Sequence, residues 1–457
     1  MTGIDLREAA VNSSINLEVK RMTKRICRAF AFLAAGILAS SVTVQAVTIN
    51  NGTMGIVATD SIQNWPQAPA VTSETAVLMD ASTGAVLYDK GMDDYRYPAS
   101  TTKLMTILVS MENSSPKDQV TFTETGIRDV KWDSSNIAAQ LGEVMSMRDC
   151  WEAAYIKSAN EVCTQIAETT GGSEADFVNM MNQRAQELGC TNTHFTNANG
   201  LPDPEHYSTA HDMAKIMQQG LKSKRFRNLI GKTDYTIKAT NLSAARQMHT
   251  HMPMMAKESS LYYESCIGGK TGFTNDAKHT LVVAAERDGR TYIAVTMRTD
   301  DLGINCKDSI SLFDYAFDNF ESLNVNGTLL TVPKGITVND LQAENQNVNG
   351  TDMNSYSYNG QFVGYVPVAV ATPEPTEAPA ETAATETDAQ TDETAGAVVS
   401  DQEAAEQEAE ETEQETEKTG NFFSDLSQTS KILLGVMGGM IVLLLILLFA
   451  LHRKENK

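Results

Sequence analysis

The sequence predicts a mixed α/β domain of the α+β type, in which one antiparallel sheet packs against helices. Two pairs of short alternating segments flank turn sequences and predict β-hairpins, one joining residues 76–80 to 85–89 and one joining residues 280–286 to 291–297. Apolar residues recur at helical spacing through most of the chain between these hairpins. Strands at both ends with helices between them are typical of helices packed on an antiparallel sheet.

The elements between and after the hairpins follow from the same patterns. A buried helix is predicted from about Ala99 to Met111, because Pro98 favours a helix start and apolar residues then recur every three or four positions. The same spacing predicts further helices at 147–169, 173–188, 210–219 and 308–320. Residues 324–371 alternate apolar residues with many Asn and Gly, which predicts a small β-rich appendage.

The first of these helices carries a candidate nucleophile and its base. Ser100 and Lys103 are three residues apart, so a helix places the hydroxyl and the amine on one face. A serine hydroxyl is a poor nucleophile near neutral pH and needs a base within hydrogen-bond reach. A lysine can be that base if burial and a neighbouring cation keep it neutral, and Lys270 is the candidate neighbour. The helix N-terminus also favours a developing oxyanion at Ser100.

Two further motifs follow in order, Ser158-Ala159-Asn160 and Lys270-Thr271-Gly272. A Lys-Thr-Gly triplet arises by chance on the order of 0.1 times in a chain of this length, whereas Ser-x-x-Lys arises about twice. Residues 114–117 are such a chance match, because Pro116 prevents a continuous helix there. Thr271 and Lys270 suit a carboxylate, and Gly272 lets a strand edge lie close to a bound peptide.

With these motifs in place, the chain resembles the low-molecular-mass penicillin-binding proteins, the serine D-alanyl-D-alanine carboxypeptidases of peptidase family S11. The resemblance covers about residues 74–323 and implies a β-lactamase/transpeptidase-like fold. It is carried by longer stretches around the motifs, at residues 78–84, 97–106, 199–203 and 269–277. It implies that the substrate is a peptidoglycan stem peptide ending in D-Ala-D-Ala and that β-lactams inhibit the enzyme.

The resemblance also implies roles for the catalytic residues. Ser100 would attack the carbonyl between the two terminal D-alanines, and Lys103 would take its proton. Ser158 would relay a proton to the departing D-alanine. Water would then release the acyl-enzyme.

A second group of residues is implied to bind the substrate. Asn160 would hold the peptide backbone, and Lys270 and Thr271 would meet the terminal carboxylate in the Lys-Thr-Gly motif that Gly272 completes. The backbone N–H groups of Ser100 and Phe273 would form the oxyanion hole. No cofactor and no metal are expected, since only His249 and His251 stand close together and no H-E-x-x-H pattern accompanies them.

The chain departs from the family pattern at two places. His249 and His251 lie where the family often has asparagines, and His211 lies where an arginine is frequent. These differences concern substrate contacts. Two other functions share the nucleophile: a β-lactamase, which often uses a dedicated glutamate for deacylation, and a non-catalytic penicillin-recognising sensor. The intact Ser100 and Lys103 argue against the sensor, and no matching glutamate motif follows Asn160 as a β-lactamase would often need.

Composition and the two ends of the sequence predict an exported, anchored protein. A basic segment, an apolar run and small residues before position 46 are typical of a signal peptide, with Met22 as an alternative start. An uncharged run of about 20 residues followed by Lys and Arg is typical of a membrane-spanning helix with a cytoplasmic tail. The net charge of −22 comes largely from the Glu- and Thr-rich segment at residues 372–419. An acidic chain of this kind is not expected to bind nucleic acid.

The predicted organisation places the catalytic domain on the cell-wall side of a single-pass membrane anchor. Its parts are a signal peptide region at 1–46, in which 1–21 is outside the alternative start, an N-terminal linker at 47–73, the catalytic domain at 74–323, the appendage at 324–371, an acidic disordered linker at 372–430, a transmembrane helix at 431–452 and a cytoplasmic tail at 453–457.

Overall fold

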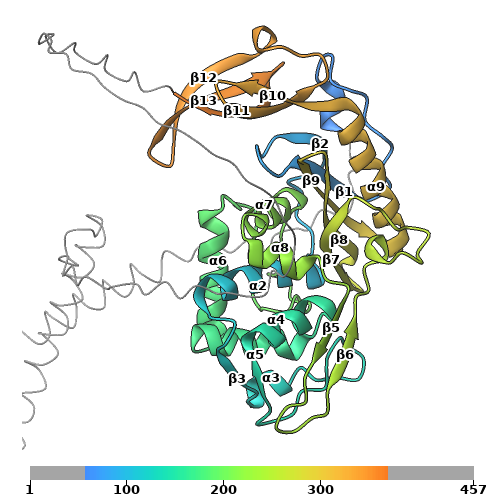
Figure 1. Ribbon diagram of the computed structural model, residues 1–457, viewed down its shortest axis with the longest axis vertical. Helices are drawn as coiled ribbons and strands as arrows, with labels where there is room; N and C mark the ends of the chain where they lie inside the picture. The colour runs from blue at the N-terminus through green and yellow to red at the C-terminus, as the bar shows by residue number, and fades with distance from the viewer. Residues whose placement is uncertain (1–56, 369–457) are drawn as a thin grey trace, which may run out of the picture. The chain divides into compact units, whose positions relative to one another are not determined.

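A five-stranded antiparallel sheet forms the centre of the computed structural model, which describes residues 57–368 (Figure 1). The strand order is β2-β1-β9-β8-β7, so β7 is an edge strand. All neighbouring strands pair antiparallel, and both predicted hairpins are confirmed. The strands are β1 (Thr75–Asp80), β2 (Val86–Lys90), β7 (Cys266–Thr274), β8 (Lys278–Arg287) and β9 (Arg290–Thr299).

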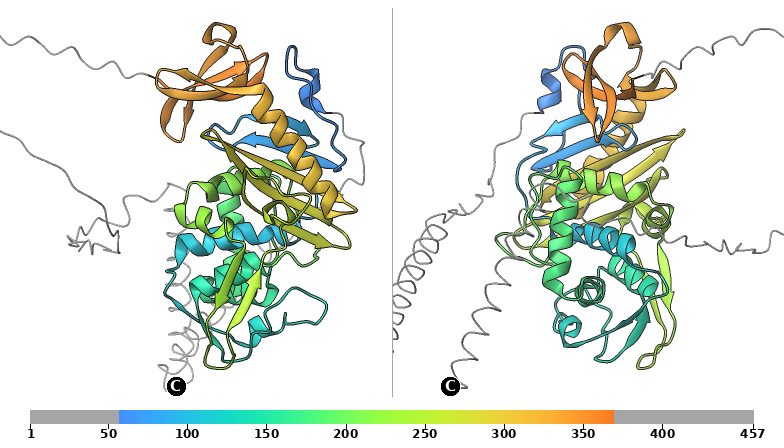
Figure 2. Two further views of the ribbon diagram at one scale, coloured as in Figure 1. Left: turned by 45° about the vertical axis from the view of Figure 1, so that its right-hand side comes forward. Right: turned by 90° about the vertical axis from the view of Figure 1, so that its left-hand side faces the viewer.

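Both faces of this sheet are buried. Along β1, Val77 and Met79 belong to one hydrophobic cluster, whereas Ala76 and Leu78 belong to a second cluster on the opposite face. This alternation follows from the period of two along a strand. Figure 2 shows the consequence, a sheet that lies between a group of helices on one side and α9 (Leu302–Asn319) on the other.

The helical side of the sheet holds most of the helices. The predictions of helices at 173–188 and 210–219 are confirmed by α6 and α7. The helices on this side are α2 (Lys103–Asn113), α3 (Glu124–Ile127), α4 (Met147–Ile156), α5 (Asn160–Gly171), α6 (Glu174–Glu187), α7 (Ala210–Leu221) and α8 (Lys224–Ile230). Two small antiparallel sheets of two strands each accompany them, β3 (Gln119–Thr121) with β4 (Val144–Ser146), and β5 (Asp234–Ile237) with β6 (Arg246–His249).

Three helix predictions need correction. The helix predicted at 147–169 is two helices, because Ser158 has a left-handed backbone with φ +57° that a continuous helix does not contain. The helix predicted from 308 begins earlier, where the Asp301 side chain accepts from the Gly303 N–H and caps it. The predicted first turn at Ala99 is a 3₁₀ turn, η2 (Ala99–Thr102), which precedes α2.

Residues 320–367 form two smaller sheets. Side chains join them to the central sheet: Gln361 Nε2 donates to the Val86 carbonyl oxygen at 2.9 Å, and the Thr83 and Thr331 hydroxyls lie 3.2 Å apart. The first strand starts at Phe320, so the boundary predicted between residues 323 and 324 falls inside it. The strands are β10 (Phe320–Val325) with β11 (Thr328–Pro333), and β12 (Gln342–Val348), β13 (Thr351–Tyr358) and β14 (Gln361–Pro367). Three short 3₁₀ turns complete the fold, η1 (Ala58–Ser61), η3 (Pro253–Met255) and η4 (Val338–Asp340).

The predicted signal peptide, acidic linker, transmembrane helix and tail lie outside the described residues, as does the start of the N-terminal linker. Within residues 57–368, no helix combines the length and the apolar character that a membrane crossing requires.

Candidate active site

Ser100 lies in the short turn η2, which several contacts hold in place. The residue before it, Ala99, has a left-handed backbone with φ +50°. The Pro98 carbonyl oxygen accepts hydrogen bonds from the Thr101 hydroxyl at 2.7 Å and from the Thr280 hydroxyl of β8 at 3.0 Å. A strained residue persists only where its surroundings fix it, so these bonds to the turn and to the sheet position the nucleophile.

Lys103 is fully buried one turn further on, and its amine touches the candidate nucleophile. Lys103 Nζ lies 2.9 Å from Ser100 Oγ and 2.8 Å from Asn160 Oδ1. The carbonyl oxygen of Asn199 is a third acceptor, at 2.5 Å. The two oxygens of Asn160 and Asn199 hold the amine against the serine, so a neutral Lys103 can accept the hydroxyl proton without moving.

Asn199 is in turn held by a buried polar group that sequence reasoning missed. Its Nδ2 donates to Thr164 Oγ1 at 3.1 Å and to Asp129 Oδ2 at 3.3 Å. Thr164 also donates to Asp129 at 2.7 Å. Residues 199–203 belong to one of the stretches that carry the family resemblance, but nothing in their sequence indicates that a backbone carbonyl faces Lys103.

His206 is a second positioning residue that the sequence did not reveal. Burial lowers the pKa of His206 to about 3, so the ring is neutral near pH 7. Its Nδ1 accepts from the Thr196 N–H at 3.1 Å, and its Nε2 therefore carries the proton and donates to the Thr102 hydroxyl at 2.8 Å. This bond connects the turn that holds Ser100 to the loop that holds Asn199.

The two lysines of the site both have lowered pKa values. Burial lowers the pKa of Lys103 to about 8. Burial, and then repulsion from Lys103, lower the pKa of Lys270 to about 7. Two amines that repel each other in a dry site titrate as a pair, so near neutral pH they share one proton. Burial lowers the pKa of Lys103 as expected from the sequence, whereas the expected repulsion between the two amines lowers the pKa of Lys270.

Gly272 brings the edge strand β7 against the nucleophile turn. A Cβ at this position would lie 2.4 Å from Thr280 Oγ1, 2.9 Å from the Pro98 carbonyl oxygen and 3.0 Å from the Ser100 backbone nitrogen. The sequence interpretation assigned Gly272 to close approach of a bound peptide. The structure gives a different reason, since the close approach is to the turn itself.

We expect Gly272→Ala to lower the rate of acylation by about 100-fold, because the added methyl group would push the Ser100 N–H out of position. A displacement of about 1 Å is enough to disrupt a reactive geometry. The rate of labelling by a fluorescent penicillin measures this effect. Gly231→Ala is the control, since a Cβ at Gly231 would lie no closer than 3.4 Å to any neighbour and its backbone, with φ −81°, accepts any residue. Equal labelling rates for wild type and Gly272→Ala would contradict the assignment.

Ser158 and Asn160 occupy the break between α4 and α5. The Asn160 N–H donates to the Ser135 carbonyl oxygen at 2.9 Å, which fixes the start of α5. Because Asn160 Oδ1 accepts from Lys103, its Nδ2 is the group that remains to meet a substrate. Ser158 Oγ is buried and has no hydrogen-bond partner within residues 57–368.

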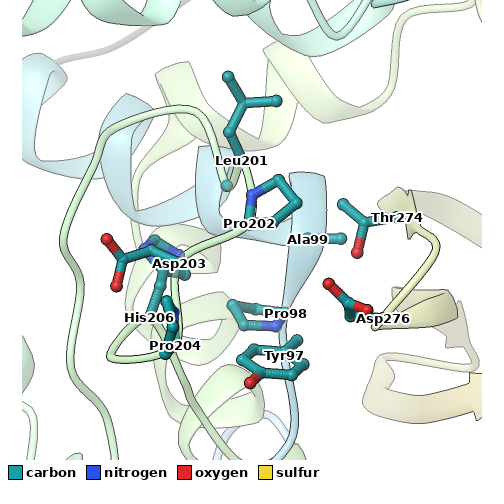
Figure 3. A pocket seen from close by; sticks show the side chains of 11 residues that line it. Tyr97, Pro98, Ala99, Leu201, Pro202, Asp203, Pro204, His206, Thr274 and Asp276 are labelled. Atoms are coloured by element: carbon teal, nitrogen blue, oxygen red, sulfur yellow. The ribbon is translucent and has the colours of Figure 1, made fainter.

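Cavities open on two sides of the site. One, of about 110 Å³, is lined by Ala99, by the loop from Gly200 to His206 and by Thr274 and Asp276 beyond β7 (Figure 3). The other, of about 20 Å³, is lined by Ser158, Lys270 and Thr271 together with His251. The second cavity therefore brings together members of two motifs that are more than 100 residues apart.

Phe273 lies next to Gly272 on the same edge strand, and about half of its surface is exposed. An edge strand has N–H and C=O groups on one side that its own sheet does not use. Hydrogen bonds join Ser100, Lys103 and Asn160, and Gly272 brings the strand that carries Lys270 against the Ser100 turn. This arrangement has the parts of a serine acyl-transfer site, with a nucleophile, a base and an edge strand for a peptide.

Comparison with known proteins agrees with this class. The sequence profile of the family described as D-alanyl-D-alanine carboxypeptidase, peptidase S11, matches residues 62–301. The chain belongs to this family.

Curated relatives support the membership. D-alanyl-D-alanine carboxypeptidase DacF of Bacillus subtilis is 30% identical over 253 residues, which are 55% of this chain and 63% of DacF. DacA of Haemophilus influenzae is 29% identical over 66% of this chain and 72% of DacA. The chain thus covers slightly less than two thirds of DacF.

Solved structures share the fold. Penicillin binding protein 6B from Escherichia coli superposes with a TM-score of 0.56 at 25% identity, over 68% of this chain and 98% of that one. The Streptomyces K15 DD-transpeptidase superposes with a TM-score of 0.51 at 26% identity, over 55% of this chain and 99% of that one. The expected antiparallel sheet with helices is confirmed.

Proposed function

We propose that this protein is a serine-type D-alanyl-D-alanine carboxypeptidase that removes the terminal D-alanine from peptidoglycan stem peptides. The observation that carries the proposal is the 2.9 Å contact between Lys103 Nζ and Ser100 Oγ in a buried site where the pKa of the lysine is lowered. The family membership and the named relatives support the choice of reaction.

In the first step, Ser100 Oγ attacks the carbonyl carbon between the two terminal D-alanines while its proton moves to Lys103 Nζ. The carbonyl oxygen becomes an oxyanion, which the backbone N–H groups of Ser100 and Phe273 stabilise. The C–N bond then breaks, and the proton passes from Lys103 through Ser158 to the departing amine. Water then attacks the acyl-enzyme and gives a proton to the neutral Lys103. This proton returns to Ser100 Oγ as the ester bond breaks and the shortened peptide leaves.

The terminal carboxylate of the substrate has a specific effect on the lysine pair. Bound beside Lys270 and Thr271, it stabilises the ammonium form of Lys270. The proton that the two amines share then resides on Lys270, and repulsion from this charge disfavours a proton on Lys103. Substrate binding therefore helps to generate the neutral base at the position where it is needed.

The two sides of the edge strand receive different parts of the substrate in this proposal. The carboxylate end binds at the mouth of the small cavity between Ser158 and Lys270. The rest of the stem peptide extends toward the cavity near Ala99 and Asp276, with Asn160 Nδ2 on its backbone. A β-lactam acylates the same serine.

The proposal includes the location of the enzyme. An apolar run at residues 432–451, followed by basic residues, supports a single-pass membrane anchor with the catalytic domain on the cell-wall side. The basic and apolar segments before residue 46 support export by a signal peptide.

The test is release of D-alanine from a diacyl tripeptide ending in D-Ala-D-Ala, measured beside turnover of a labelled penicillin. A carboxypeptidase releases D-alanine and retains the drug as a slowly hydrolysed adduct. Rapid turnover of the drug without D-alanine release would instead identify a β-lactamase. Stable labelling with no D-alanine release would identify a sensor.

The lysine pair predicts a bell-shaped dependence of kcat/KM on pH. Below a pH of about 7 both amines are protonated and no base is present, so activity rises as pH rises through that value. Above a pH of about 8 both amines are neutral, so the cation for the carboxylate is lost and activity falls. A phenyl ester of an acyl-D-alanine has no terminal carboxylate, so its profile should lack the falling limb. A flat profile for the peptide would contradict the roles of the pair.

A further inference from the structure

His251 follows the small hairpin β5–β6 and lies at the carboxylate end of the site. It lines the same small cavity as Ser158, Lys270 and Thr271. The residue is exposed to solvent, whereas Lys270 is buried at the same cavity. A group bound against Lys270 therefore meets the imidazole on its solvent side.

The charges around His251 are all positive or neutral. Lys157, at the end of α4, lies with its Nζ 3.5 Å from His251 Nε2, where the ammonium donates to the neutral ring and would repel the imidazolium form. Lys270 of β7 is the other cation, and Tyr155 of α4 is a neutral member of the wall. In the described part of the chain, no aspartate or glutamate lines this cavity. Three potential cations without a lining carboxylate make a site for an anionic group.

We propose that His251 is a specificity residue that binds the free carboxylate of the terminal D-alanine and so selects leaving groups that carry this charge. The inference rests on the proposed carboxypeptidase function and adds to it a residue that none of the three motifs contains. Lys270 and Thr271 meet one side of the carboxylate, and His251, in its imidazolium form, donates from the other side.

The protonation of His251 responds to the presence of this anion. Burial first, and then Lys157 and Lys270, lower the pKa of His251 from its ordinary value near 6.5. In the free enzyme the ring is thus largely neutral near pH 7. A carboxylate between the three groups opposes the repulsion and favours the imidazolium form. Binding should therefore be tightest below the pKa of free His251 and weaken as pH rises through it.

The pH dependence of binding that comes from His251 can be separated from the titration of the two lysines. The His251 limb lies on the acid side of pH 6.5, whereas the Lys270 limb lies near pH 7. His251→Asn keeps a side-chain hydrogen-bond donor of similar size and removes the charge. His249→Asn is the matched control, because His249 pairs with Asp234 across the β5–β6 hairpin and does not line the cavity.

The experiment measures KM and kcat for two substrates from about pH 5 to 8, the range in which histidine titrates. One substrate is the diacyl tripeptide with a free terminal carboxylate, and the other is the phenyl ester without one. His251→Asn should raise KM for the tripeptide about tenfold at the acid end, as expected for the loss of one charged hydrogen bond. The acid limb of KM should disappear, the phenyl ester should be unaffected, and His249→Asn should behave as wild type.

The alternative results each overturn the inference. An unchanged KM for the tripeptide would show that His251 does not touch the carboxylate. An equal loss on both substrates would show a structural role. Failure of the proposed function is distinguishable from these results, because the wild-type enzyme would then release no D-alanine from the tripeptide.

Discussion

Replacement of Ser100 by alanine is expected to lower kcat/KM for D-alanine release by about 10⁴-fold or more, as loss of the nucleophile does in enzymes whose catalytic groups act as a unit. The hydroxyl forms the only covalent bond to the substrate in the proposed mechanism, and no other group can replace it. Stability should change by no more than about 1 kcal/mol, because Lys103 keeps its bonds to Asn160 and Asn199. D-alanine release and thermal unfolding measure the two quantities.

The chain supplies a matched control for this substitution. Ser114 begins a second Ser-x-x-Lys sequence, which the structure places after the end of α2, where the Ser114 hydroxyl lies 3.2 Å from that of Thr170. Ser114→Ala should therefore leave D-alanine release unchanged. Substantial activity in Ser100→Ala, with wild-type unfolding, would show that another residue is the nucleophile.

Replacement of Lys103 by arginine should lower the rate of acylation by about 10³-fold, within the range found for removal of a general base. The guanidinium group keeps its proton throughout the accessible pH range, so it cannot accept one from Ser100. The variant retains the positive charge and separates the charge of Lys103 from its basicity. Stopped-flow acylation by a chromogenic penicillin, measured across pH, reports the effect.

Two further variants sharpen this result. Lys103→Met removes the charge and the base together and should be as inactive as the arginine variant, with thermal unfolding reporting whether the buried position accepts each side chain. Lys117→Arg changes the lysine of the chance Ser-x-x-Lys match and should have no effect. An arginine variant with wild-type acylation would contradict the role of Lys103 as base.

The contact between Ser100 and Lys103 was predictable from the sequence, because the two residues are three positions apart and helical spacing is a local property of the chain. It also predicted the two hairpins of the central sheet, whose turns and alternation are local. The edge position of β7 and its approach to the turn through Gly272 were not predictable, since they depend on how distant segments pack. The motif was visible in the sequence, but the reason for its glycine was not.

The helix break at Ser158 shows a second limit. Residues 147–169 have continuous helical periodicity and contain no glycine or proline before the break, so no local signal interrupts the pattern. The break is stabilised by a contact from another segment, the bond from the Asn160 N–H to the Ser135 carbonyl oxygen. Tertiary contacts here outweigh helix propensity.

The support around Lys103 could not be predicted for the same reason. Asn199, Asp129 and Thr164 come from three segments and meet only in the folded chain. Their residue types are common in loops and helices, so each has an ordinary structural explanation in the sequence alone. The lowered pKa of Lys103 was expected from the chemistry, but the burial that causes it is a property of the fold.

Mass spectrometry of the protein after reaction with penicillin tests the central claim most directly. Proteolysis of the adduct should yield one modified peptide, with the penicilloyl mass on Ser100, and the modification should be absent in Ser100→Ala. Attachment of the drug to any other residue, or no adduct on folded protein, would contradict the account of Ser100 as the nucleophile activated by Lys103.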